Sequence, residues 1–220
     1  MGWIRRYDMS DDIERETGLE FAVGAAERGE LIVLPTDTVY GLGTNAFLPD
    51  AVEDLLHAKG RGRDMPVPVL IGSPRTLDGI ATGVSAPARA LVEACWPVGL
   101  TLVCRVQPSL RWDLGETRGT VAVRMPLHPV AIELLVRTGP MAVSSANRSG
   151  LPAATTVDEA IDQLGESVSV YLDGGSSTLG PEALPSTIVD VTGEAPRLLR
   201  PGAVSVELIR EVAGEVIVEP

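Results

Sequence analysis

The sequence gathers three cationic side chains on one glycine-rich stretch. Lys59, Arg61 and Arg63 alternate with glycines in "AKGRGRD", and Lys59 is the only lysine of the chain. A lysine offers a compact charge and an arginine a fork of donors, and both bind polyphosphates. The stretch therefore predicts a phosphate-binding loop, although the spacing of a Walker A loop is absent. For Lys59 alone an alternative stays open, because a cation at the carboxyl end of a helix offsets the helix dipole by about 0.3–1 kcal/mol.

A second polar stretch, "PTDTVYGLG" at 35–43, follows a short apolar run. Thr36, Asp37 and Thr38 carry short hydrogen-bonding side chains, and the two glycines after them permit close approach of another backbone. Open α/β sheets bind ligands at the ends of strands, so the stretch predicts a rim that hydrogen-bonds a small polar ligand. An Asx- or ST-turn without a ligand is the alternative.

Arginine and hydroxyl side chains also interrupt the apolar pattern of the second half. Arg124 lies among apolar residues in "TVAVRMP", where a cation needs either a structural ion pair or the carboxylate of a ligand. The stretch "VSSANRSG" at 143–150 is either an elaborate turn or a pocket whose Ser and Asn groups bind a nucleotide. "LPSTIVD" and "LLRPG" continue the theme, with small hydroxyls before a strand and Arg200 before a proline.

The sequence lacks the patterns of covalent catalysis. A G-x-S-x-G elbow and a histidine-rich metal set are absent, and neither Cys95 nor Cys104 has a basic neighbour in sequence. A site of Thr, Ser, Asn, Lys and Arg works by positioning reactants and neutralising charge. Phosphoryl and nucleotidyl transfer are usually assisted in this way.

The composition limits the class of protein. The 220 residues are 45% hydrophobic and carry a formal net charge of −12, which argues against a broad, non-specific grip on RNA or DNA. A local basic pocket for a small anion remains compatible with that charge. The apolar runs are too short to cross a bilayer, and residues 1–12 lack the apolar middle of a signal peptide. We therefore expect a cytoplasmic protein with reduced thiols and no membrane partner.

Helices and short β-branched strands must position these residues. Capping residues, glycine stops and apolar spacing predict helices at 10–29, 49–60, 85–96, 128–139, 156–165 and 205–214. Strands are predicted at 30–36, 67–72, 100–106, 120–126, 141–146, 169–173, 186–191 and 196–200. Ser10 is the expected N-cap of the first helix, and the pairs Asp50/Glu53 and Thr156/Glu159 have capping-box spacing. The alternation predicts an α/β fold with a mixed, twisted sheet, and we expect 1–220 to form one domain.

Seven stretches, taken in order, resemble the YrdC-type threonylcarbamoyl-AMP synthases: "PTDTVYGLG", "KGR", "WPVGLTL", "TVAVRMP" with its following "H", "SSANRSG", "STIVDV" and "LLRPG". The resemblance covers about residues 17–205 and is to the short form, without the additional C-terminal domain of longer relatives. It implies a twisted mixed sheet, flanked by helices, around a large central cavity with a positive lining. It also implies synthesis of L-threonylcarbamoyl-adenylate from L-threonine, bicarbonate and ATP, with release of pyrophosphate. A partner complex then transfers the threonylcarbamoyl group to tRNA, beside the anticodon.

The resemblance implies roles for individual residues. Lys59 and Arg61 match a Lys-x-Arg pair that binds the phosphates of ATP and assists catalysis. Further positions on the ATP side are Thr120, Ser145, Asn147, Ala153 and Arg200. Positions on the L-threonine side are Thr38, Arg124, Val143 and Ser186. Mg²⁺ is expected to accompany ATP, although the sequence shows no ligand set for it, and direct binding of tRNA stays open.

The chain also departs from the family pattern. Gly62 stands where relatives have a proline, Met65 where they have an asparagine and Leu70 where they have a histidine, and "WPVG" replaces "WPGP". The roles of that asparagine and histidine are therefore not carried over, and Arg63 matches no assigned position. Two alternatives are a double-stranded RNA-binding or ribosome-associated factor without ATP turnover, and a carbamoyl-transferring maturation enzyme. The zinc-binding and acylphosphatase-like parts of the latter are not visible in the sequence.

Overall fold

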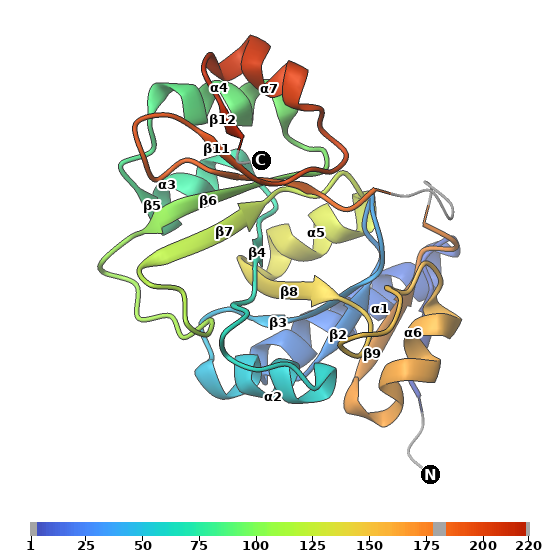
Figure 1. Ribbon diagram of the computed structural model, residues 1–220. Helices are drawn as coiled ribbons and strands as arrows, with labels where there is room; N and C mark the ends of the chain where they lie inside the picture. Colours follow the sequence, from blue (N-terminus) through green and yellow to red (C-terminus); the bar gives the residue numbers. More distant parts are fainter. Residues whose placement is uncertain (1–3, 178–183, 219–220) are drawn as a thin grey trace.

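The computed structural model describes residues 4–177 and 184–218, and the strands of these ranges form one twisted sheet with helices on both faces (Figure 1). The order across the sheet is β1-β9-β2-β3-β8-β4-β7-β6-β10-β11-β12, and β5 pairs with β6 outside this path. The strands are β1 (Arg6–Asp8), β2 (Ile32–Leu34), β3 (Gly41–Asn45), β4 (Val69–Leu70), β5 (Ala81–Thr82), β6 (Leu100–Val106), β7 (Thr120–Arg124), β8 (Met141–Ser145), β9 (Val170–Asp173), β10 (Thr187–Asp190), β11 (Arg197–Arg200) and β12 (Ile217–Val218). The helices are α1 (Asp12–Glu27), α2 (Pro49–Lys59), α3 (Leu77–Ile80), α4 (Ala86–Cys95), α5 (Pro129–Thr138), α6 (Val157–Leu164) and α7 (Val206–Ala213), with 3-10 turns η1 (Pro74–Thr76) and η2 (Gly165–Ser167).

The sheet mixes parallel and antiparallel pairs, as the sequence predicted. β9 runs parallel to both β1 and β2, whereas β3 runs antiparallel to β2 and β8. β7 is parallel to β4 and antiparallel to β6. The predicted α/β class with a mixed, twisted sheet is therefore confirmed.

Two hydrophobic cores cover the two faces of the sheet. β2 shows the division, because Val33 belongs to one core, and Ile32 and Leu34 on either side of it belong to the other. α1 and α5 cover the face of Ile32, and α2, α4, α6 and α7 contribute to the core of Val33. Successive side chains of a strand point to opposite faces, so a wholly apolar strand requires cover on both. Within the described ranges, no helix combines the length and apolarity that a bilayer crossing requires.

The helix ends confirm some capping predictions and correct others. Asp11, not Ser10, is the N-cap of α1, and its carboxylate accepts from the amides of Ile13 and Glu14. Ser10 instead donates its hydroxyl to Asp8. The Asp50/Glu53 capping box is wrong, because α2 begins at Pro49 and the residue before it makes no side-chain cap. The Thr156/Glu159 box is confirmed, as is the left-handed Gly60 that ends α2.

β3 is a strand that the sequence did not predict. Its segment, Gly41–Asn45, contains two glycines and reads as part of a turn. Close packing explains both, since a Cβ at Gly41 would lie 2.7 Å from Val143 Cγ1 and one at Gly43 would lie 3.0 Å from Val143 Cγ2. The glycines therefore permit the close approach that the sequence suggested, but to another strand of the sheet.

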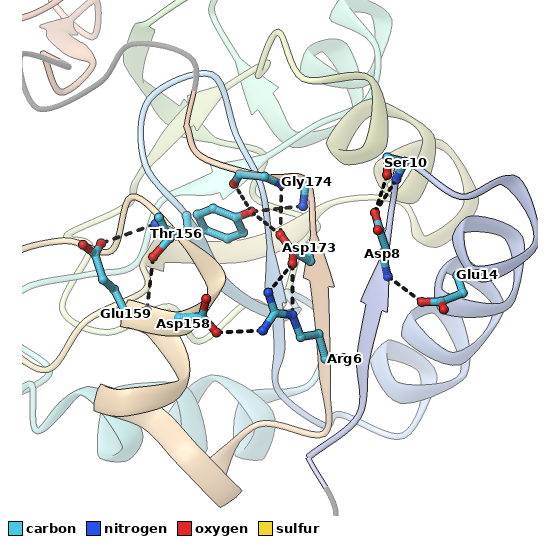
Figure 2. Close-up of polar contacts among 11 residues, drawn as sticks. Arg6, Asp8, Ser10, Glu14, Thr156, Asp158, Glu159, Asp173 and Gly174 are labelled. Carbon is cyan, nitrogen blue, oxygen red and sulfur yellow. Dashed lines mark hydrogen bonds and ion pairs between the residues drawn. The ribbon is translucent and has the colours of Figure 1, made fainter.

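A polar network anchors the loop after β9 to the polar stretch 35–43. Figure 2 shows Arg6 of β1 bridging Asp158 at 2.7 Å and Asp173 at 2.6 Å. The hydroxyl of Tyr40 donates to the carbonyl oxygen of Gly175 at 2.5 Å and accepts from the amide of Gly174 at 3.0 Å. The two loops, far apart in the sequence, are thereby held side by side.

Candidate functional site

Lys59 is the last residue of α2 and is buried, with 3% of its surface exposed. Its Nζ donates to the main-chain oxygens of Ser145 and Asn147, at 2.5 and 2.8 Å, and to Asn147 Oδ1 at 3.2 Å. An ammonium group has three N–H donors, so each has an acceptor within the protein. Burial, and secondarily the charge of Arg61, lowers the pKa of Lys59 to about 8. Lys59 therefore lies at the carboxyl end of a helix and also donates hydrogen bonds within a buried polar cluster.

Arg61 follows on the α2–β4 loop (60–68) and keeps part of its guanidinium free. Its Nη1 donates to Ser144 Oγ at 3.2 Å and its Nη2 to the carbonyl oxygen of Pro66 at 3.4 Å. Its Nε is buried, and none of the described residues accepts a hydrogen bond from it. Burial lowers the pKa of Arg61, yet an arginine stays charged at any physiological pH. The buried donor is therefore a cationic group without an acceptor.

These residues form what we call the lysine cluster: Lys59, Arg61, Ser144, Ser145 and Asn147. The side-chain amide of Asn147 donates to the carbonyl oxygens of Arg148 and Leu151, while its oxygen accepts from Lys59. Asn147 was predicted on the ATP side, and its polar atoms are engaged in holding the 146–151 loop. Ser144 was not a predicted site residue, and the hydroxyl density of "VSSANRSG" is the signal that could have found it.

Arg124 ends β7 and is buried, with 8% exposure. Its Nη2 lies 2.6 Å from Asp37 Oδ1, and its Nη1 donates to Thr38 Oγ1 at 3.0 Å. The Nε is also buried and has no hydrogen-bond partner among residues 4–177 and 184–218. The structural ion pair therefore exists, and it leaves one nitrogen of the guanidinium, Nε, without an acceptor among the described residues. Asp37, known from the sequence only as part of a polar stretch, is the residue that orients Arg124.

Ser186 and Arg200 lie beside this pair. Ser186 Oγ is 2.8 Å from Thr101 Oγ1, and Arg200 Nη2 donates to the carbonyl oxygen of Ser186 at 2.7 Å. Thr101 is the register partner of Arg124 across β6 and β7. Burial, and then the charge of Arg124, lowers the pKa of Arg200, so two guanidiniums face the same region.

We call this second group the arginine cluster: Asp37, Thr38, Thr101, Arg124, Ser186 and Arg200. It brings together Thr38, Arg124 and Ser186, all predicted on the L-threonine side. It also contains Arg200, which was predicted on the ATP side. Thr101 was missed, although a polar residue in the apolar strand 100–106 was a usable signal.

Main-chain hydrogen bonds join the two clusters. The amide of Ala146 donates to the carbonyl oxygen of Tyr40 at 2.7 Å. The amide of Tyr40 donates to the carbonyl oxygen of Ala154 at 2.9 Å. The loop of Thr38 is thereby tied to the loop of Asn147. Ala153, predicted on the ATP side, immediately precedes one of these acceptors.

Three predicted site residues, Thr120, Val143 and Ala153, are members of neither cluster. Thr120 opens β7, about 13 Å of strand from Arg124, and its hydroxyl donates to the carbonyl oxygen of Thr117. Val143 buries its side chain in the core under α1 and α5, and its amide donates to Pro68 O at 2.9 Å. The structure thus groups the predicted residues that form ion pairs or offer hydroxyls near them, and leaves Thr120 and the side chain of Val143 outside these groups.

Two hollows have no member of these clusters in their lining. One, of about 450 Å³, is lined by Glu30, Asp54, His57 and Ser169 among others, and the second, of about 430 Å³, by Asp8, Arg15, His128 and Asp173 among others. Neither has a predicted site residue in its lining. The large central cavity that the resemblance implied stays a prediction.

Comparison with known proteins gives the geometry a family. The Sua5/YciO/YrdC family model, described as "Telomere recombination", matches residues 25–202 of the chain. The chain belongs to the Sua5/YciO/YrdC family. The family resemblance of the seven sequence stretches is therefore confirmed.

Relatives in the Sua5/YciO/YrdC family are similar over nearly the whole chain. A Mycobacterium tuberculosis protein assigned as a threonylcarbamoyl-AMP synthase is 55% identical over 208 residues, which are 94% of each chain. The threonylcarbamoyl-AMP synthase of Pyrococcus abyssi is 36% identical over 206 residues, covering 93% of this chain and 60% of that protein. The crystal structure of P. abyssi Sua5 complexed with L-threonine superposes with a TM-score of 0.89 at 33% identity, covering all of this chain and 63% of that one.

Proposed function

We propose that this member of the Sua5/YciO/YrdC family synthesises L-threonylcarbamoyl-adenylate from L-threonine, bicarbonate and ATP. The observation that carries the proposal is a pair of buried cationic donors, Arg61 Nε and Arg124 Nε, one in each of two adjoining clusters. Neither has an acceptor in the part of the chain that the structure describes. Buried charged donors require a partner, and in a chain of net charge −12 these two remain available for anions. The names of the relatives support the same reaction.

The reaction joins two anions, so its main obstacle is electrostatic. The amine nitrogen of threonine attacks the carbon of bicarbonate, and loss of water leaves an N-carboxy-threonine. A carboxylate oxygen of that carbamate forms a bond to the α-phosphorus of ATP. The bond from this phosphorus to the bridging oxygen breaks, and its electron pair leaves with pyrophosphate. The protein has to bring the anions together and neutralise their charge.

We assign the phosphates of ATP to the lysine cluster. Arg61 is the direct donor, because its Nε has no acceptor within residues 4–177 and 184–218. Lys59 acts through its charge, because its three N–H groups already bind Ser145 and Asn147. The resemblance implied that both cations bind the phosphates; here Arg61 is proposed to donate hydrogen bonds to them and Lys59 to contribute charge. Ser145 of this cluster, together with Ala153 and Thr120 outside it, is also proposed to line the nucleotide.

We assign L-threonine to the arginine cluster. Arg124, held by Asp37, presents its free Nε to the substrate carboxylate, and Thr38 and Ser186 offer hydroxyls beside it. Arg200 adds a second cation on the side where carboxylate and α-phosphate meet. The backbone at Val143 is proposed to adjoin this side.

Mg²⁺ is proposed to arrive with ATP as part of the substrate. Within residues 4–177 and 184–218 no three His, Cys, Asp or Glu side chains gather to hold a metal ion. The phosphates of ATP are therefore its proposed ligands, where it would neutralise part of their charge. We further propose a cytoplasmic location and a threonylcarbamoyl-transferase complex that passes the product to tRNA.

The test is pyrophosphate release by the purified protein. We expect release from ATP to require both L-threonine and bicarbonate, and mass spectrometry to detect threonylcarbamoyl-adenylate. Release that is independent of either substrate would refute the proposal. Steeply salt-dependent binding of double-stranded RNA without ATP turnover would instead support the alternative of an RNA-binding factor.

A further inference from the structure

The α2–β4 loop, which carries Arg61, lies directly against the β6–β7 loop (107–119). The main-chain amide of Glu116 donates to the carbonyl oxygen of Arg63 at 2.8 Å. The amide of Val67 donates in the other direction, to the carbonyl oxygen of Leu114, at 2.9 Å. Two backbone hydrogen bonds, one in each direction, therefore join loops that are distant in sequence.

Side chains reinforce this junction. Arg63 Nη2 lies 2.5 Å from Asp113 Oδ1, and the amide of Gly115 donates to the same carboxylate oxygen at 3.3 Å. The Arg63 guanidinium holds the pKa of Asp113 below its usual range. Arg63 is the third cation of "AKGRGRD" and the one to which the family resemblance gave no position. Its partner lies on the loop that leads into β7.

Gly115 lets the β6–β7 loop pack against Pro66, which accepts a hydrogen bond from Arg61. Its φ is +99°, and a Cβ there would lie 2.8 Å from the carbonyl oxygen of Arg63 and 3.2 Å from Pro66 Cα. The carbonyl oxygen of Pro66 accepts from Arg61 Nη2. A displacement at Gly115 would therefore reach the guanidinium through one intervening residue.

Arg61 needs such support, because it stands between Gly60 and Gly62. Glycine leaves the backbone many conformations, and an arginine side chain adds its own freedom. The hydrogen bonds of the guanidinium, at 3.2 and 3.4 Å, are long. An isolated ion pair as exposed as Arg63–Asp113, at 50% and 44%, contributes little by itself. Its joint action with two backbone bonds and a glycine contact gives it a larger effect on the loop.

We propose that the β6–β7 loop positions Arg61 for phosphate through Asp113, Gly115 and their contacts with Arg63 and Pro66. Arg63 is thus a positioning residue rather than a phosphate ligand. The inference rests on the proposed role of Arg61 as the phosphate donor. It also gives the third cation of the stretch a function.

The first test is direct binding of pyrophosphate by isothermal titration calorimetry. Arg63→Ala should weaken binding about two- to five-fold, the range that the energy of an exposed ion pair permits. The double variant Arg63→Asp with Asp113→Arg, which reverses the pair, should recover part of the loss. Arg89→Ala is the matched control, because Arg89 forms an exposed pair with Asp78 away from the site and should bind like wild type.

The second test uses Gly115, whose substitution acts on the backbone contact rather than on charge. Gly115→Ala should weaken pyrophosphate binding about tenfold or more, since misplaced catalytic groups lose large factors. Gly83→Ala is its control: Gly83 also has positive φ, +63°, but nothing lies within 4 Å of a Cβ there. Circular dichroism and melting temperature verify that each variant is folded.

Either of two results with the variants would overturn the inference: wild-type binding in both Arg63→Ala and Gly115→Ala, or equal losses in Gly115→Ala and Gly83→Ala. Wild-type protein that does not bind pyrophosphate would also overturn it. Steady-state kinetics separates it from the proposed function. If wild type binds pyrophosphate but shows no threonine-dependent turnover, the proposed function fails and the binding data alone decide. If wild type is active, Arg63→Ala should raise KM for ATP and leave KM for L-threonine unchanged.

Discussion

The ammonium nitrogen of Lys59 lies 2.8 Å from the main-chain oxygen of Asn147, 88 residues further along the chain. The contact ties the carboxyl end of α2 to the loop after β8. It also places a buried positive charge near Arg61, which donates to Ser144 of β8. One side chain therefore affects both the shape and the electrostatics of the proposed phosphate site.

Replacement of Lys59 should show both effects. Lys59→Ala is expected to abolish pyrophosphate release and to lower the free energy of unfolding by about 1–3 kcal/mol, because buried acceptors on Ser145 and Asn147 lose their donor. Urea denaturation and the coupled pyrophosphate assay measure the two quantities. A variant with wild-type turnover would remove Lys59 from the site.

The pH dependence should have opposite signs for activity and stability. Burial lowers the pKa of Lys59 to about 8, whereas the ordinary pKa of a lysine side chain is 10.5. ATP binding that uses the positive charge should weaken as pH rises above about 8. Between about pH 8 and 10.5 the unfolded chain binds more protons at this residue than the folded chain, so the contribution of Lys59 to stability rises with pH.

The matched variant for the pH experiment is Lys59→Met, which has no proton to lose. Denaturant midpoints of both proteins are measured from pH 7 upward, and their difference isolates the residue from other titrating groups. A wild-type stability that falls relative to Lys59→Met across this window would contradict a lowered pKa of Lys59.

Asp37 should control the use of L-threonine. Asp37→Asn keeps the shape of the side chain but removes the charge opposite Arg124. We expect KM for L-threonine to rise about tenfold, in line with the loss of one charge-assisted hydrogen bond, while KM for ATP changes little. Asp78→Asn, in the exposed pair with Arg89, is the control. Equal KM changes for both substrates would argue against the assignment of L-threonine to this cluster.

The N-cap of α1 provides a test of stability alone. Asp11→Ala should lower the free energy of unfolding by about 1 kcal/mol, since two amides lose their acceptor. Ser10→Ala is the neighbouring control and should stay within about 0.5 kcal/mol, as an exposed residue outside the cap. The reverse order of the two effects would restore the cap that the sequence predicted.

The sequence predicted the elements whose local signals agree with their packing. Thr156 and Glu159 form the expected capping box, and Gly60 ends α2 in the left-handed conformation. Local signals failed where a neighbouring residue competed for the same role. Pro49 occupies the first turn of α2 and places Asp50 within the helix, and Asp8 takes the hydroxyl of Ser10.

The sequence predicted which types of residue form the site, but not which of them contact one another. Arg124 required either a structural pair or a ligand, and in the structure Asp37 fills the first role while Nε remains for the second. Long-range contacts of this kind depend on strand order, which no local pattern encodes. β3 shows the same limit, because its glycines become a strand only when β2 and β8 pair with them on both sides.

The burial of Lys59 has a practical consequence for chemical labelling. Apart from the amino terminus, this ε-amine is the sole amine in the chain for amine-directed acylating reagents, and 3% of the residue is exposed. Peptide mapping after a brief acylation pulse separates this amine from the amino terminus and therefore reports on one location in the protein. Protection by a nucleotide would appear as the loss of a single mass increment.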